Sequence, residues 1–238
     1  MIVISYGIPK SGSTLAFEMA RAVFDMNGFS QERLDHGVVG RGTNINFVHE
    51  WSDERLLRLI ESTRGRRVVV KTHREPNVSP ESVLELMDAG DLKIQVVYRD
   101  PRDTIVSMLD QGVLERRIGA GSFRSVHVLE DGINVLGRHV ENLRQWGSFP
   151  SLKLRYEDFA FDPTAGPSMI AEALGLPVDP AEVWEVVDRR FTQRNVARPE
   201  RYKTELSIDE IARIERAFPL YLDVVAGKPP VGWFARPG

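Results

Sequence analysis

The chain has 238 residues, of which 27% are charged and 42% hydrophobic, and its formal net charge is -3 at pH 7. This length suits one large domain spanning residues 1–238. The negative balance argues against nucleic acid as a partner, because nucleic-acid binding needs a basic surface. The absence of cysteine excludes disulfides and thiolate metal ligands. No apolar run reaches the ~18–20 residues of a membrane span, and Met1 leads straight into an apolar run, so we expect no signal peptide and a cytoplasmic protein.

Short apolar runs alternate with amphipathic segments along the chain. The elements predicted, in chain order, are a strand at 2–6, helices at 13–26 and 53–63, a strand at 66–70, a helix at 80–88, a strand at 92–98, helices at 102–110 and 130–147, a strand at 151–155, and helices at 165–174, 180–190 and 207–217. Segments 28–50 and 111–128 are predicted as loops, the second exposed and mobile. Strands separated by helices predict an α/β fold, a three-layer sandwich with a central parallel β-sheet.

The first strand runs directly into segment 7–14, which reads GIPKSGST and opens the first helix. Gly7 and Gly12 have the separation of a Walker A loop, but Ser13 stands where that motif has its lysine, and Lys10 lies inside the loop instead. A strand, a glycine turn and a helix start make a P-loop-like phosphate cradle, because free backbone N–H groups and the positive helix end face one anion. The alternative is a tight turn that happens to contain glycines.

Two further strands end in residues suited to charge and proton handling. Lys71 and His73 follow the strand at 66–70, and histidine suits proton transfer near neutral pH. The alternative is a histidine that packs near a loop. Arg99 follows the strand at 92–98 and could bind a phosphate through its planar fork, with Ser107 two turns into the next helix.

Arg102 and Asp103 lie between Arg99 and Ser107, and they could equally be a solvated surface pair. Ligands of parallel sheets bind beyond the carboxyl ends of the strands, so the three strand-end segments should meet in one crevice.

The three segments together resemble those of the sulfotransferases that use 3′-phosphoadenosine 5′-phosphosulfate (PAPS). Segment 9–14 is similar to that family's loop for the 5′-phosphosulfate, and segment 98–103 with Ser107 is similar to its 3′-phosphate motif. Segment 71–73 is similar to the stretch that bears the catalytic histidine, and segment 154–159 (LRYEDF) matches a strand-end signature. The order and spacing of these motifs imply a PAPS-dependent sulfotransferase.

The resemblance implies roles for individual residues. His73 would be the general base, Lys10 would neutralise charge on the bridging oxygen, and Lys71 would polarise a sulfonate oxygen, with Glu75 as a second candidate base. The residues implied to bind the co-substrate are Pro9, Lys10, Ser11, Gly12, Ser13, Thr14, Arg99 and Ser107. The C-terminal motif of the family is absent, and Arg198, Arg201 and Lys203 are expected to close over the 3′-phosphate in its place. No metal is implied, and no cluster has metal-ligand spacing.

The sequence departs from the family at the adenine site. Members often carry a tryptophan five residues after the loop lysine, where this chain has Leu15. Trp51 and Phe191 are the remaining candidates for stacking on adenine.

The acceptor is open. It would present a hydroxyl, or an amine, on a small molecule, carbohydrate or lipid, and segments 36–51 and 111–128 are expected to line its pocket. Two other functions are considered: a P-loop kinase or phosphotransferase, which would need a lysine at Ser13 and an aspartate such as Asp100 for Mg²⁺, and a non-catalytic nucleotide-binding protein. The sequence does not decide the oligomeric state.

Overall fold

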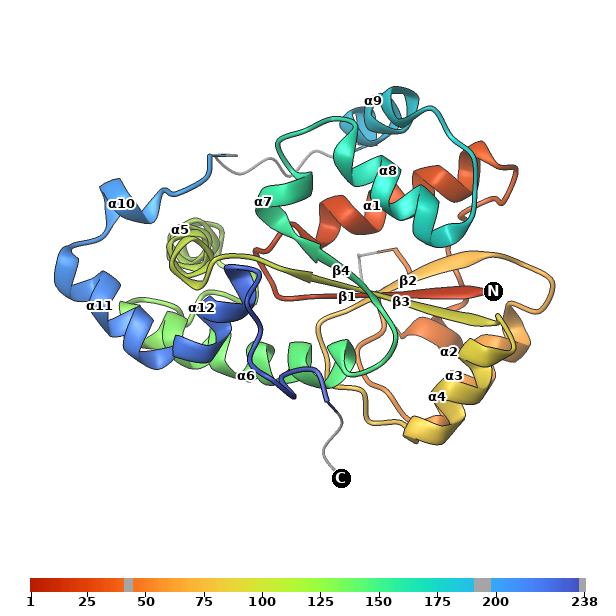
Figure 1. Ribbon diagram of the computed structural model, residues 1–238, viewed down its shortest axis with the longest axis horizontal. Helices are drawn as coiled ribbons and strands as arrows, with labels where there is room; N and C mark the ends of the chain where they lie inside the picture. Colours follow the sequence, from red (N-terminus) through yellow and green to blue (C-terminus); the bar gives the residue numbers. More distant parts are fainter. Residues whose placement is uncertain (41–44, 191–197, 236–238) are drawn as a thin grey trace.

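The computed structural model describes residues 1–40, 45–190 and 198–235 (Figure 1). Within these residues four strands form a parallel sheet in the order β2-β1-β3-β4. The strands are Ile2–Gly7 (β1), Val68–Thr72 (β2), Leu92–Tyr98 (β3) and Leu152–Arg155 (β4). The four predicted strands and their parallel arrangement are confirmed, with boundaries shifted by one or two residues.

Helices cover both faces of the sheet because the strands are apolar on both sides. Val3 and Val97 face a cluster formed with α1 (Ser13–Met26), α8 (Ala165–Leu174) and α9 (Pro180–Arg190), which lie above the sheet in Figure 1. Ile4 and Val96 face the opposite cluster, which includes residues of α3 (Asp53–Ser62), α4 (Pro80–Asp88), α6 (Leu129–Gly147) and α12 (Pro219–Val225). The predicted three-layer α/β fold is therefore confirmed.

The helix predicted to end at residue 110 continues to 118, so α5 spans Pro101–Ile118 and the expected loop begins only at Gly119. Gly112 lies inside the longer helix, although glycine ordinarily destabilises a helix interior. Its role is in packing, because a Cβ there would lie 2.4 Å from the carbonyl oxygen of Val126. The segment after the helix therefore folds back across α5 at the one position without a side chain.

Four short helices lie in segments that were not predicted as helical: α2 (His36–Val39), α7 (Tyr156–Phe159), α10 (Tyr202–Glu205) and α12. The predicted helix at 207–217 is α11 (Ile208–Ala217), and the Ser207 side chain caps it. In the parts of the chain that the structure describes, no helix is both long and apolar enough to cross a membrane.

The strand order predicts a crevice at the carboxyl edge of the sheet. The chain leaves β1 toward β2 on one side, whereas β3 connects to β4 on the other side. A crevice opens where neighbouring connections diverge in this way, so the loops after β1 and β3 should flank it. These loops are segments 7–14 and 99–107.

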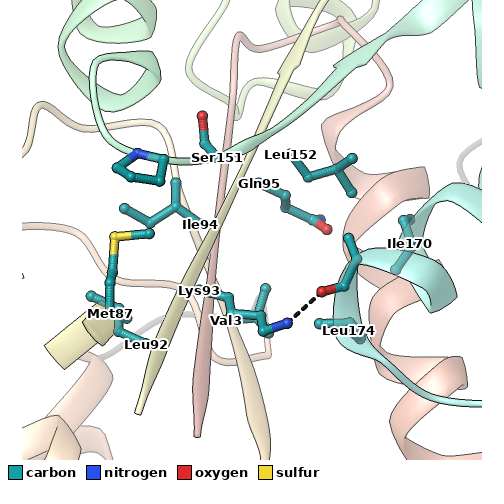
Figure 2. Close-up of a pocket in the computed structure, with 12 residues that line it drawn as sticks. Val3, Met87, Leu92, Lys93, Ile94, Gln95, Ser151, Leu152, Ile170 and Leu174 are labelled. Atoms are coloured by element: carbon teal, nitrogen blue, oxygen red, sulfur yellow. Dashed lines mark hydrogen bonds between the residues drawn. The ribbon is translucent and has the colours of Figure 1, made fainter. Parts of the chain in front are cut away.

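A cavity of about 280 Å³ lies at the opposite edge. Strand β4 begins opposite Gln95, so the first residues of β3 have no strand beside them on that side. Leu92, Ile94 and Leu174 are among the apolar side chains around this space, and the Lys93 ammonium donates a hydrogen bond to the Ala173 carbonyl beside it (Figure 2). None of the predicted site residues lines this cavity.

Candidate active site

The side chain of Ser11 stabilises the turn of the loop after β1 through hydrogen bonds to the backbone. The hydroxyl of Ser11 donates to the carbonyl oxygen of Ile8 (2.6 Å), and the Val97 carbonyl lies 3.2 Å away. Ser11 is fully buried, so its hydroxyl is engaged by the backbone inside the loop. Lys10 (φ 69°) and Gly12 (φ 81°) take left-handed conformations to make the turn. The loop geometry is therefore fixed by contacts within the chain itself.

The helix that follows the loop starts without a side-chain cap. In the described parts of the chain, no side chain bonds to the first N–H groups of α1, and these groups have no partner within the helix. Helix α5 differs, because the Asp100 carboxylate accepts from the Arg102 N–H at 2.8 Å. The backbone at Ser13 and Thr14 can therefore bind an anion with the favourable helix dipole.

Lys71 reaches this helix start from β2. Its ammonium donates to the Thr14 hydroxyl, and the residue is only 8% exposed. Burial, with a smaller contribution from the Lys10 charge, lowers the pKa of Lys71 to about 7, while Glu18 acts in the opposite direction. A bound anion would restore the ammonium form of Lys71, since an opposite charge favours the charged state.

His73 follows β2 and is fixed by the first strand. Its Nδ1 lies 2.5 Å from the Gly7 carbonyl oxygen, which can only accept, so Nδ1 carries the proton and Nε2 keeps its lone pair. Burial first, and then the charge of Lys71, hold the pKa of His73 well below its ordinary value. The imidazole is therefore neutral at pH 7. The ring of Phe47 packs edge-on against it, at 5.3 Å between centroids.

Arg99, at the end of β3, contacts the loop after β1 (residues 7–14), which we call the phosphate loop because of its predicted role. Its guanidinium donates to the Lys10 carbonyl (3.4 Å) and to Asp103 (3.2 Å), and it lies over the Tyr156 ring at 4.4 Å. Arg99 is 5% exposed, yet its Nε–H has no hydrogen-bond partner among the described residues. A buried guanidinium with an unused donor fits an anionic ligand.

Positive charge gathers where these segments meet. The pKa of Lys10 is lowered chiefly by burial and further by Arg99 and Arg201, whereas Glu115 and Asp110 raise it. Lys10 donates to the Gln111 side chain at 2.9 Å. Partly desolvated cations that repel one another fit a ligand with more than one negative charge. Among the described residues, no group of acidic, histidine or cysteine side chains could hold a metal ion.

The three C-terminal candidates take different positions. Arg201 is buried and paired with Asp110 and Glu205, both within 2.7 Å. Asp110 adjoins Gln111, which accepts from the Lys10 ammonium, so Arg201 lies close to the loop lysine.

Arg198 is exposed, bonds to Thr204 and lies 3.6 Å from Glu205. Lys203 is exposed and pairs with Glu200. Of these three cations, only Arg201 is brought to the loop lysine. Ser107 is buried on α5, two turns beyond Arg99.

Several expectations about neighbouring residues are corrected. Arg102 and Asp103 do not form a surface pair, because Arg102 binds Asp100 and Glu215 while Asp103 is buried against Arg99.

Trp51 is a core residue, 3% exposed, whose ring meets that of Trp146 at 5.5 Å. It therefore offers no free face to adenine. Phe191 lies outside the described residues, and Glu75 is exposed beyond His73.

The sequence interpretation missed the residues that hold Arg99 in place. The Tyr221 hydroxyl of α12 donates to the Arg99 carbonyl (2.8 Å) and accepts from its N–H (3.3 Å). Asp103 accepts from the backbone N–H groups of Glu200 (2.8 Å) and Tyr202 (3.1 Å) as well as from Arg99. The spacing of sequence motifs cannot predict this contact, because Tyr221 lies 122 residues after Arg99.

Comparison with known proteins identifies the family. The sequence matches the sulfotransferase domain family over residues 2–216, which is most of the chain, so the chain belongs to this family. No curated protein sequence gives a significant match. The prediction of a sulfotransferase enzyme is confirmed, whereas the roles of individual site residues stay predictions.

Solved structures share the fold. Retinol dehydratase in complex with androsterone and the inactive cofactor PAP aligns with a TM-score of 0.54 and 16% identity, over 96% of this chain and 81% of that chain. Retinol dehydratase with retinol and PAP aligns with the same score and identity, over 96% and 82%. The sulfotransferase from Alicyclobacillus acidocaldarius aligns at 18% identity over 97% of each chain, with a TM-score of 0.47.

Gly12→Ala should lower the free energy of unfolding by roughly 1–3 kcal/mol, because a left-handed backbone is combined with a Cβ placed 2.4 Å from the Tyr156 ring. Gly90→Ala is the control, since Gly90 has φ 76° but no atom within 4 Å of such a Cβ. Urea unfolding measures both variants. Equal losses would mean that the Tyr156 contact imposes no cost.

Lys71→Met should stabilise the ligand-free protein by roughly 1–3 kcal/mol at pH 7, because it removes a buried ammonium. The pKa of Lys71 is about 7 in the folded chain and 10.5 ordinarily, so the folded state loses its proton first as pH rises. The stability difference between variant and parent should therefore be largest below pH 7 and shrink toward pH 10.5. Denaturant unfolding across this range measures it, and a difference that does not change with pH would contradict the lowered pKa.

Proposed function

We propose that this enzyme transfers a sulfuryl group from PAPS to an acceptor hydroxyl or amine. The observation that carries the proposal is the contact between two anion sites, in which the Arg99 guanidinium reaches the carbonyl oxygen of Lys10 in the phosphate loop. PAPS carries one phosphate on each side of its ribose, which suits a pair of adjoining sites. The retinol dehydratase structures that share this fold were determined with PAP bound.

The co-substrate is assigned to the two sites by charge. The α1 backbone at Ser13 and Thr14 would hold the 5′-phosphosulfate, with Pro9 and Gly12 shaping the loop. Arg99 and Ser107 would hold the 3′-phosphate, and Arg201 would contribute positive charge beside them. Arg198 and Lys203 have weaker support, because each is exposed and paired with a glutamate.

His73 is proposed as the general base. Its Nε2 would accept the proton of the acceptor hydroxyl as the acceptor oxygen forms its bond to sulfur and the bond from sulfur to the bridging oxygen breaks. Lys10 would stabilise the negative charge that the departing phosphate gains, and Lys71 would stabilise the transferring sulfonate. Such charge stabilisation in a desolvated site is usually the largest contribution to catalysis.

The kinase alternative has less support. It would need an aspartate free to bind Mg²⁺, but both carboxylate oxygens of Asp100 lie against Arg102. The position of a Walker A lysine is occupied by Ser13.

The acceptor is proposed to carry its hydroxyl on an apolar or aromatic body. The rings of Phe47 and His139 lie beside that of His73, with centroids 5.3 and 6.3 Å away, and the His49 ring packs against Phe47 at 4.7 Å. Such a surface favours a flat or apolar molecule through ring contacts. Small-molecule, lipid and carbohydrate acceptors with a ring face all fit this description. Phe47 and His49 belong to segment 36–51, and their position supports a role for this part of the segment in acceptor binding.

3′-Phosphoadenosine 5′-phosphate should bind at least tenfold more tightly than 5′-AMP, because each charge-assisted hydrogen bond to the 3′-phosphate contributes about 1.5–3 kcal/mol. Arg99→Ala should remove most of this preference. Tyr221→Phe should reduce it while leaving 5′-AMP binding unchanged, since only the peptide of Arg99 loses its support. Titration calorimetry measures all three proteins, and equal affinities of the parent for both nucleotides would exclude the assignment.

His73→Ala should lose roughly 10²-fold or more in kcat, because the acceptor proton loses its base, while PAP affinity stays unchanged. The parent should keep full activity from pH 7 down to below 6.5, because the pKa of His73 is held under its ordinary value. Transfer from radiolabelled PAPS to a panel of phenols, alcohols and sugars measures both. Glu75→Gln is the matched comparison, and loss of activity there but not in His73→Ala would make the carboxylate the base.

A further inference from the structure

A chain of hydrogen bonds runs from the loop lysine along one face of α5. The Lys10 ammonium donates to Oε1 of Gln111 (2.9 Å), and Nε2 of Gln111 donates to Oε1 of Glu115 (3.0 Å). Oε2 of Glu115 accepts from the backbone N–H of Phe123 (2.5 Å). Residues 111 and 115 are one helical turn apart, so both side chains lie on the same face. This series of hydrogen bonds ends at Phe123, within segment 119–127, which we call the return segment.

The carboxylate in this chain is enclosed. Glu115 is 7% exposed, and a Cβ on Gly121 would lie 2.0 Å from its carboxyl carbon. The return segment is held from its far end as well, because Arg116 donates to the Val126 carbonyl at 2.7 Å. The segment is therefore wrapped closely around Glu115.

The order of the partners fixes the orientation of the Gln111 amide. An ionised carboxylate can only accept hydrogen bonds, so the Gln111 NH₂ group must face Glu115. The amide oxygen must then face Lys10, which can only donate. Gln111 also keeps the carboxylate out of direct contact with Lys10. The lysine thus has a fixed neutral partner and retains its charge for a ligand.

We propose that Gln111 and Glu115 are positioning residues for Lys10, and that they connect it to the return segment. This inference rests on the proposed function, in which Lys10 stabilises charge on the departing phosphate. Neither residue touches the reacting atoms. The amide holds the ammonium at one place in the crevice, and the carboxylate holds the amide in the orientation that accepts from it.

The charges around Lys10 give a readout that is independent of turnover. Glu115 and Asp110 raise the pKa of Lys10, Arg99 and Arg201 lower it, and burial lowers it most. Glu115→Gln removes one of the two opposing negative charges, so it should lower the pKa of Lys10 further. This pKa reports the electrostatic link between Glu115 and Lys10, whereas Gln111→Met changes no charge and reports the positioning.

The test compares Glu115→Gln and Gln111→Met with the parent enzyme. Each variant should lose roughly tenfold in kcat, because misplacement of a charge-stabilising group slows the reaction, while PAP binds within about twofold of the parent. Glu141→Gln is the matched control, because Glu141 accepts from Gln145 one turn along α6 on an exposed surface. It should change neither quantity.

The pKa of Lys10 is measured directly by NMR titration of its side chain, assigned by loss of the signal in Lys10→Met. Direct observation is needed because Lys71 titrates near pH 7. We expect Glu115→Gln to lower the pKa of Lys10 by at least about half a pH unit. An unchanged pKa together with an unchanged kcat would overturn the proposal.

Failure of the proposed function has a different signature. If the parent transfers no sulfuryl group to any acceptor but the Lys10 pKa responds to Glu115→Gln, the hydrogen-bond chain stands and the reaction assigned to it is wrong. If Glu115→Gln does not fold, Gln111→Met decides, because it breaks the link to Lys10 while leaving the Phe123 bond intact. Full kcat in a folded Gln111→Met would then reject the positioning role.

Discussion

The guanidinium of Arg99 is the contact on which the candidate site depends. It touches the phosphate loop through the Lys10 carbonyl, α5 through Asp103, and the segment after β4 through Tyr156. Its own peptide is clasped by Tyr221 of α12. Segments from the first, middle and last parts of the chain therefore meet around one side chain. Because Arg99 keeps an unused Nε–H, these contacts orient the group without consuming it.

Because these segments bring several cations together in a buried place, the positive charges destabilise one another when no anion is bound. Burial lowers the pKa values of both Lys10 and Lys71, and the positive charge of Lys10 lowers that of Lys71 further. A protein tolerates such crowding where a polyanion is to bind, since functional sites are where perturbed pKa values gather. Binding of a polyanion would then also restore the protonated forms of Lys10 and Lys71. The site is organised in advance for a ligand that neutralises it.

The sequence predicted the scaffold and the segments of the site better than their connections. Short apolar runs between helical segments predicted the sheet, and the strand-end motifs predicted that Lys10, His73 and Arg99 follow its strands, because local sequence determines both. Tyr221 could not be predicted, since its partner lies 122 residues away and no spacing rule joins them. The extension of α5 was missed because Gly112 ordinarily weakens a helix, and here tertiary packing overrides that preference.

The long separation between Arg99 and Tyr221 has a consequence for biogenesis. At typical rates of synthesis, 122 residues take roughly 6–25 seconds to translate. During this interval the nascent chain can form β1, β2 and β3 but lacks the hydroxyl that clasps the Arg99 peptide. The cations of the site would then be present before their geometry is complete. If Arg99 binds the 3′-phosphate as proposed, tight nucleotide binding begins only after α12 has packed against the sheet. Nucleotide binding would then indicate that folding is complete.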